Sequence, residues 1–222
     1  KQDKSTNRPY LSIIQVYILT KPAFRMKTPS NINVTSKDLI SAINGDRPLK
    51  ILLPSYRSNP HTGGQGIYMR LISKAIVDLG HEVDVISGPP YPYLDQRVGL
   101  IELPSLDMYA RDNPLTCLNN DIISNRIDLF ELWSHNWVGF PEPYTFGERL
   151  KNYMKTRISD YDIMHDNQTL CYGMLEVRNM GLPVVGTIHH PITKDRHIEI
   201  THAKSPFLKL LKWRWYSLSL IH

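Results

Sequence analysis

The sequence predicts an α/β fold built on a doubly wound, Rossmann-like parallel sheet. The first observation is a short apolar run at residues 49–54, followed by a glycine-rich loop and by apolar residues at helical spacing. The second is another apolar run at residues 82–87, directly after that helix. A strand, a helix and a second strand in this order indicate a right-handed βαβ crossover, and therefore parallel strands. The third observation is that strands and helices keep alternating along the chain, which is typical of this class.

The individual elements follow from the same signals. Strands are expected over residues 49–54, 82–87, 98–103, 161–165 and 182–189. Helices are expected over residues 67–79, 121–129, 146–158, 169–180 and 205–222. Gly80 and Gly181 follow two of these helices directly, which is a common place for glycine at a helix end. The rest of residues 104–143 is expected to be irregular, because it is rich in Pro, Asn and Asp.

Positive charge is concentrated at the beginning of the chain. The 222 residues hold 26 Lys and Arg against 21 Asp and Glu, and the pI is near 9.1. Residues 1–50 contain nine of the basic and three of the acidic side chains, so the rest is nearly neutral. Residues 1–47 are therefore predicted to be a basic, disordered leader, and residues 48–222 the folded domain. Peripheral contact of the leader with an anionic membrane is the alternative.

Composition also excludes several classes of function. A nucleic-acid-binding domain carries its basic patch on folded structure, so nucleic acid is not an expected partner. No apolar run approaches the roughly 20 residues of a membrane-spanning helix. The two cysteines, Cys117 and Cys171, provide no disulfide framework. These features predict a cytoplasmic protein, peripheral to the inner face of the membrane if the leader binds there.

A glycine-rich loop connects the first predicted strand to the first helix. It contains Gly63, Gly64, Gln65 and Gly66. Glycines let a backbone approach a ligand closely, and the N–H groups of a helix N-terminus attract phosphate. The loop is therefore a candidate phosphate site, with a tight turn as the structural alternative. It is neither a dinucleotide fingerprint, since no acidic residue ends the second strand, nor a P-loop, since Ile67 follows Gly66.

Polar side chains follow the fourth and fifth predicted strands, where ligands bind in open α/β sheets. They are His165 and Asn167 after the fourth strand, and His189, His190, Thr193 and Arg196 after the fifth. Single histidines are usually structural, but imidazoles at two strand ends beside a glycine loop indicate a functional site. A metal centre is the rival interpretation. No metal is expected, because adjacent histidines rarely bind one ion and no H-E-x-x-H spacing occurs.

Taken together, these segments resemble the N-terminal domain of family 4 glycosyltransferases, which have the GT-B fold of two facing Rossmann-like domains. The resemblance covers residues 48–222. It is carried by residues 60–66, 79–83, 87–92, 141–143, 161–168 and 187–193. The Gly-Gly loop and the Leu-Gly-His-Glu-Val segment are shared by much of the family. The His-His-Pro-Ile-Thr segment resembles a narrower bacterial subgroup.

The resemblance implies transfer of a sugar from a nucleotide-sugar donor, with retention at the anomeric carbon and with no further cofactor. The loop of residues 63–66 would hold the donor diphosphate, and His189 would be the catalytic residue beside the donor sugar. Histidine suits this role because its pKa lies near working pH. The acceptor side would be lined by His165, Asn167, His190, Thr193 and Arg196. Arg196 would pair either with an anionic acceptor or with Asp195.

Family members bind most of the nucleotide through a second domain of similar size, which these 222 residues do not include. The chain by itself is therefore expected to be inactive. One alternative is a non-catalytic module that binds a polar ligand or a partner chain, and another is a metal hydrolase built on the His and Asp residues. The sequence identifies neither the donor base, nor the sugar, nor the acceptor, which could be a saccharide, a lipid-linked molecule or a small molecule.

Overall fold

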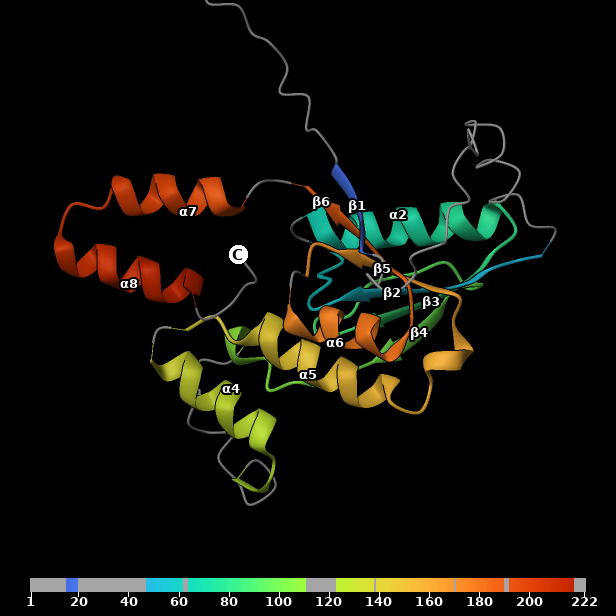
Figure 1. Cartoon of the computed structure of the whole chain (residues 1–222), viewed down its shortest axis with the longest axis horizontal. Coiled ribbons are helices and arrows are strands. Elements are labelled where there is room, and N and C mark those ends of the chain that lie inside the picture. Colours follow the sequence, from blue (N-terminus) through green and yellow to red (C-terminus); the bar gives the residue numbers. More distant parts are fainter. Residues whose placement is uncertain are drawn as a thin grey trace, which may run out of the picture.

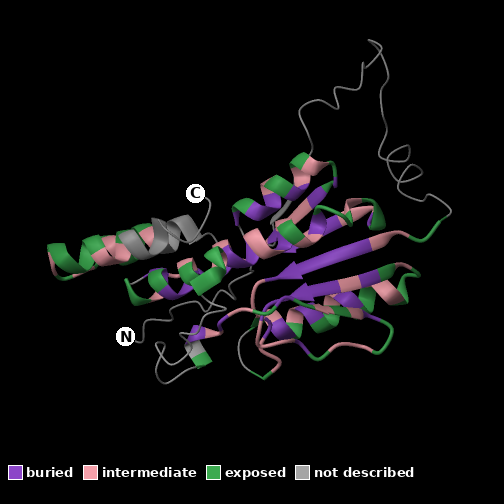
Figure 2. Ribbon diagram, turned by 90° about the horizontal axis from the view of Figure 1, so that it is seen from below, coloured by how far each residue is buried: buried purple, intermediate pink, exposed green. Residues whose placement is uncertain are grey.

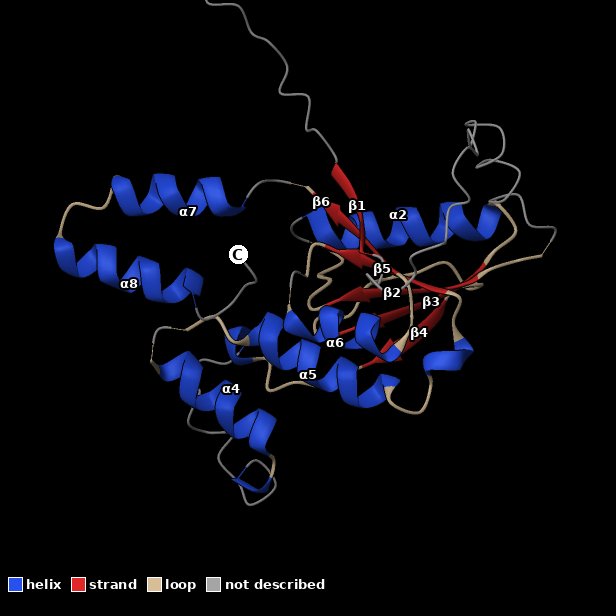
Figure 3. Cartoon of the chain, viewed as in Figure 1, coloured by secondary structure: helices blue, strands red, loops and turns tan. Residues whose placement is uncertain are grey.

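The computed structural model describes residues 15–19, 47–61, 64–110, 123–137, 139–169, 171–189 and 192–217. Among these residues, six strands form one sheet in the order β1-β6-β5-β2-β3-β4 (Figures 1 and 3). The strands are β1 (Gln15–Leu19), β2 (Lys50–Ser55), β3 (Glu82–Ser87), β4 (Gly99–Glu102), β5 (Ile163–Asn167) and β6 (Val184–Ile188). All neighbouring pairs from β2 to β6 are parallel. This arrangement confirms the predicted Rossmann-like parallel sheet.

Helices cover both faces of the sheet (Figure 1). One face carries α2 (Gly64–Asp78), and the other carries α5 (Glu142–Met154) and α6 (Tyr172–Met180). On the outside of α5 packs α4 (Arg126–Asn136). The helices α7 (Ile192–Thr201) and α8 (Pro206–Ser217) contact each other in a hairpin that lies away from the sheet. Two short 3₁₀ turns, η1 (Met108–Ala110) and η3 (Ile158–Asp160), complete the described elements.

The strand order reverses at β2, which is the point that positions the candidate site. From β2 the chain moves outward through β3 to β4, then returns to build β5 and β6 on the opposite side of β2. The loops that leave the carboxyl ends of β2 and β5 therefore diverge. In open α/β sheets this divergence creates the crevice in which ligands bind.

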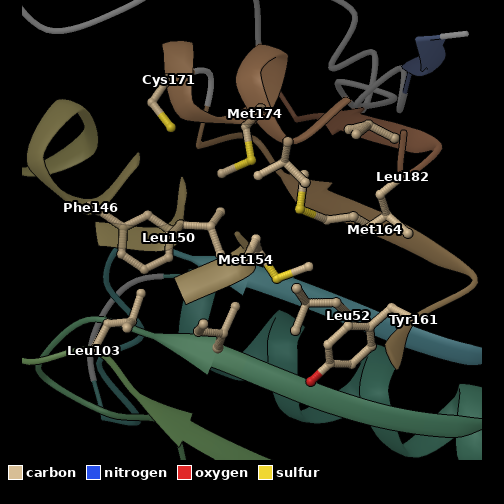
Figure 4. Packing of buried hydrophobic residues seen from close by; sticks show 13 residues of the cluster. Leu52, Leu103, Phe146, Leu150, Met154, Tyr161, Met164, Cys171, Met174 and Leu182 are labelled. Atoms are coloured by element: carbon tan, nitrogen blue, oxygen red, sulfur yellow. The ribbon is translucent and has the colours of Figure 1, made fainter. Parts of the chain in front are cut away.

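The core has two layers because side chains alternate across the sheet. In β2, Leu52 faces α5 and α6, whereas Ile51 and Leu53 face α2. Figure 4 shows the larger layer, where Met154, Met164 and other apolar side chains fill the space between helices and strands. Burial is deepest along the strands, as the colouring of Figure 2 shows. This two-sided burial explains the nearly continuous apolar sequence of β2.

Two glycines allow α5 and α6 to approach closely. A Cβ on Gly173 would lie 2.3 Å from the backbone oxygen of Gly147, and one on Gly147 would lie 2.5 Å from Sγ of Cys171. No side chain larger than hydrogen fits either position without moving the helices. The contact fixes α5 against the sheet, with its first residue, Glu142, at the carboxyl edge. Cys171 is fully buried beside it, as expected for a core residue.

The leader differs from expectation in one described segment. Residues 15–19 form β1, which pairs antiparallel with β6, for example Tyr17 opposite Gly186. A disordered leader was expected here, so for these five residues that expectation is wrong. The strand forms backbone hydrogen bonds with β6 at an edge of the sheet. Amino-acid composition does not show whether such an edge is open for pairing. The other leader residues up to 46 lie outside the described part.

Several helices also differ from the sequence expectation. A helix was expected over residues 121–129, but α4 covers Arg126–Asn136. It begins at Arg126 because the side chain of Asn125 accepts hydrogen bonds from two backbone N–H groups of its first turn. Helix α5 begins four residues before the expected start, since proline is tolerated in a first turn and Pro143 does not end it. Helix α7 occupies residues where a loop was expected, and α8 is described only to Ser217.

Within the described part, no helix has the length and apolar character needed to cross a bilayer.

Candidate active site at the carboxyl edge of the sheet

The glycine loop opens α2, and its glycines have different surroundings. Gly66 is buried, and a Cβ there would lie 2.1 Å from the backbone oxygen of Asn59. Gly64 has open space where its Cβ would be. Gly66 therefore lets the helix start pack against the loop after β2, while Gly64 leaves the N-terminus accessible. Gly63 lies outside the described residues, and half-buried Gln65 hydrogen bonds to the side chain of Tyr56.

His189 follows β6 and is held from three sides. Its Nε2 lies 2.6 Å from Oδ1 of Asn167, and its backbone N–H donates to Oε1 of Gln168 at 2.7 Å. The ring of Tyr68 meets the imidazole edge-on, with 4.6 Å between the ring centroids. Because an amide oxygen can only accept, Nε2 is the donor in the contact with Asn167. Tyr68 belongs to the second turn of α2, so the ring lies beside the helix N-terminus.

His165 lies in β5, on the same face of the sheet as Asn167. Its Nε2 lies 2.7 Å from Oγ1 of Thr187, on the neighbouring strand β6. Burial, together with the nearby His189, lowers the pKa of His165 below its usual 6.5. The ring is therefore neutral at pH 7, because a charged imidazole would lose its hydration and lie close to a second one. We call His165, Asn167, Gln168, Thr187 and His189 the histidine cluster.

The end of β5 keeps unusual features next to these histidines. Gln168 has a positive φ of 52°, which is uncommon for a residue with a side chain. The amide nitrogen of Asn167 and the hydroxyl of Thr169 are buried without a hydrogen-bond partner. Backbone strain and unpaired buried donors both carry a free-energy penalty, and strained residues cluster at active sites and ligand contacts.

The other predicted site residues, on and next to α7, are described only in part. His190 lies outside the described residues. Thr193 is in the first turn of α7, but nothing is described of its side chain. Arg196 is half-buried in the same helix, so it projects from a helix rather than from the expected loop. The structure therefore brings together His165, Asn167 and His189.

A second polar cluster lies on the other side of β2, and it was not among the predicted site residues. Glu142 is 7% exposed at the start of α5, and its Oε2 lies 3.6 Å from Nη1 of Arg57. Burial raises the pKa of Glu142 to about 7; Arg57 opposes the shift, whereas Glu131 and Asp107 add to it. We call Asp107, Glu131 and Glu142 the carboxylate cluster.

Part of this carboxylate cluster is structural. Glu131 is fully buried; its Oε1 accepts from the backbone N–H of Leu106 at 3.2 Å, and its Oε2 lies 2.6 Å from Nη2 of Arg149. Asp107 has a positive φ of 44° and a buried Oδ1 without a partner. The three carboxylates come from an interstrand loop and two helices. Proximity of this kind leaves no spacing pattern in the sequence.

A metal centre receives no support from the described residues. Within them, no three His, Cys, Asp or Glu side chains are grouped so that they could hold an ion. The edge of the sheet instead has an accessible helix N-terminus beside His189, and a set of carboxylates on the other side of β2. This combination defines a Rossmann-like ligand-binding domain suited to a polar substrate.

Comparison with known proteins gives the family. The sequence pattern of Glycosyltransferase Family 4 matches residues 62–221, which is more than half of the chain. The chain belongs to this family, and its sheet is the half of a GT-B fold that the sequence predicted.

One curated relative extends this result. The MMP alpha-(1->4)-mannosyltransferase of Mycolicibacterium hassiacum is 46% identical over 169 residues, which is 76% of this chain. The aligned part is 41% of the relative, so the chain spans less than half of that protein's length.

Proposed function

We propose that this chain is the N-terminal, acceptor-side part of a retaining glycosyltransferase that uses a nucleotide-sugar donor. The observation that carries the proposal is the position of His189, which Asn167 and Gln168 hold beside the N-terminus of α2. The helix start offers N–H groups to a diphosphate, and an imidazole beside it can stabilise the developing charge or pass a proton. Family membership supports sugar transfer, and the retaining course is part of the proposal.

The proposed donor carries mannose, because the relative from Mycolicibacterium hassiacum is a mannosyltransferase by name. The base and most of the donor contacts are assigned to a second domain of the whole protein. Residues 63–66 would contact only the diphosphate. The 222 residues by themselves are therefore expected to give no turnover, with or without an acceptor.

The test is a transfer assay with the whole protein, a panel of mannosyl and glucosyl nucleotides and a mixture of acceptors. Product formation, with the anomeric configuration read by NMR, would support both the activity and retention. A product of inverted configuration would contradict the retaining course alone. Absence of transfer and of donor hydrolysis with every nucleotide sugar would contradict the enzymatic proposal, and it would favour a non-catalytic binding module.

A further inference from the structure

The chain turns sharply at the end of β5, and a side chain fixes this turn. The backbone N–H of Thr169 donates to both carboxylate oxygens of Asp166, at 3.2 Å each. The two residues between them, Asn167 and Gln168, are buried as well. A side-chain hydrogen bond that spans the turn keeps the backbone of these two residues in place. We call residues 166–169 the β5 turn.

Two residues of the β5 turn lower the stability of the folded chain. Gln168 has a φ of 52°, and glycine would adopt this conformation without the steric strain. The amide nitrogen of Asn167 is buried without an acceptor, so it has lost its hydration and gained no hydrogen bond. Leucine has a similar shape and would avoid that penalty. Folding stability therefore explains neither residue.

Both residues contact His189 through the oxygen of a side-chain amide. Oδ1 of Asn167 lies 2.6 Å from Nε2 of the ring, and Oε1 of Gln168 accepts from the backbone N–H of His189 at 2.7 Å. One amide therefore holds the ring, and the other holds the backbone that carries it. Strained residues persist where the surrounding structure requires their geometry, often at active sites. Two adjacent penalties with one common partner indicate that the β5 turn serves to hold His189.

The contact with Asn167 also determines where the ring carries a proton. An amide oxygen only accepts, so Nε2 keeps its hydrogen for as long as the contact exists. Tyr68 of α2 packs edge-on against the same ring, and His165 of β5 is close enough to interact with it electrostatically. Asp166 lies on the opposite face of β5. The partner of Nε2 is therefore neutral, and a carboxylate in its place would favour the charged ring.

We propose that Asn167 and Gln168 are positioning residues, which hold His189 in its reactive orientation and reduce folding stability in doing so. Neither residue contacts the substrate in this role, and both act through His189. Asn167 is only 2% exposed, so its amide is assigned to the histidine rather than to the acceptor. This inference rests on the proposed glycosyltransferase function and adds two residues on which the reaction depends.

The first test compares activity with stability in the whole protein. Asn167→Leu removes the unpaired nitrogen together with the contact to the ring, and Gln168→Gly removes the strain together with the contact to the backbone. Each variant should lower kcat about tenfold to 100-fold, because the histidine is no longer held in place. The midpoint of urea unfolding should stay equal or rise in both.

Thr169→Val is the matched control for this test. It also removes a buried, unpaired donor from the β5 turn, but the hydroxyl of Thr169 has no hydrogen bond to His189. This variant should keep the unchanged kcat, and its midpoint of urea unfolding should stay equal or rise.

The second test follows the ring of His189 by NMR in this chain and needs no transfer. In Asn167→Asp the ring should titrate about one pH unit higher or more, because the new carboxylate favours the charged form. In Asn167→Leu the neutral ring should no longer be confined to a proton on Nε2, which the nitrogen chemical shifts report. Thr169→Val should change neither property. In the whole protein, Asn167→Asp should keep more activity than Asn167→Leu, with its pH profile moved to higher pH.

Three results would overturn the inference. The first is an unchanged kcat in Asn167→Leu. The second is a lower midpoint of urea unfolding in this variant, which would show that Asn167 serves stability. The third is a ring of His189 that titrates alike in Asn167→Asp and in the unchanged chain. Absence of transfer by the unchanged whole protein would instead contradict the proposed function, and the NMR titrations would still decide whether Asn167 holds the ring.

Discussion

The histidine cluster and the carboxylate cluster lie at the same edge of one sheet, on opposite sides of β2, and they are built in different ways. In the histidine cluster the polar groups are held mainly by hydrogen bonds between neighbouring strand ends. In the carboxylate cluster they are held by two arginines, Arg57 and Arg149, against a surplus of acidic groups. Burial acts on both, keeping His165 neutral at pH 7 and raising the pKa of Glu142 to about 7.

Burial therefore has a different consequence in each cluster. Hydrogen-bonded imidazoles can accept or donate a proton near neutral pH. A buried carboxylate with a raised pKa instead makes folding stability depend on pH. We propose that the chemistry takes place at the first cluster, and we expect the second cluster to control this pH dependence. Each of the following experiments tests that division.

Replacing the proposed catalytic histidine should have the largest effect. His189→Ala in the whole protein should lower kcat about 100-fold or more, because a positioned acid–base group contributes roughly that much. Glu142→Gln should change kcat far less, because Glu142 lies outside the histidine cluster. Steady-state kinetics of both variants is the measurement. Equal effects of the two variants on kcat would contradict the placement of the chemistry at the histidine cluster.

The contact beneath the glycine loop should have the next largest effect. Gly66→Ala should lower the free energy of unfolding by about 1–3 kcal/mol or more, since its Cβ would lie 2.1 Å from a backbone oxygen that cannot move away easily. Gly64→Ala is the matched control, because its Cβ meets open space. Denaturant unfolding measures both. Equal stability of the two variants would show that Gly66 does not carry this packing.

The buried Glu142 should make stability depend on pH. Its folded pKa of about 7 is above its usual 4.5, so the folded state holds a proton that the unfolded state has already released. Stability should therefore fall as pH rises from about 4.5 to 7. Glu142→Gln should remove this fall and add up to about 3 kcal/mol at pH 8. Urea unfolding at pH 5 and pH 8 is the measurement, and parallel curves for both proteins would contradict it.

The coupling between the two histidines should give the smallest effect. Burial and then His189 lower the pKa of His165, so that its ring titrates below 6.5. Removing the second imidazole in His189→Ala should raise the pKa of His165 toward the usual value, though burial remains. NMR titration of the His165 ring resolves such a change. A pKa for His165 that does not change would show that the histidines are not electrostatically coupled.

The parallel sheet and three members of the histidine cluster could be predicted from the amino-acid sequence. The alternation of apolar runs with segments of helical periodicity predicts β2 to β6. It does so because each strand or helix buries one face, and the residues of that face recur at a regular spacing along the sequence. The positions of His165, Asn167 and His189 could be predicted for a related reason. They lie at or just after the ends of two strands, and the carboxyl ends of parallel strands meet at one edge of a sheet. Gly66 was recognised as special, although its role in close packing became clear only from the nearby Asn59 carbonyl.

Other features depend on contacts between segments that are distant in the sequence. The strand β1 exists because an edge of β6 was open for pairing, and α7 forms where the local sequence indicated a loop. Glu142 and Arg57 are 85 residues apart in sequence, and their distance of 3.6 Å depends on how α5 packs against the loop after β2. Local sequence controls local conformation and hydrophobic pattern. Electrostatic surroundings depend on which distant segments share a low-dielectric space, and that is a property of the folded chain.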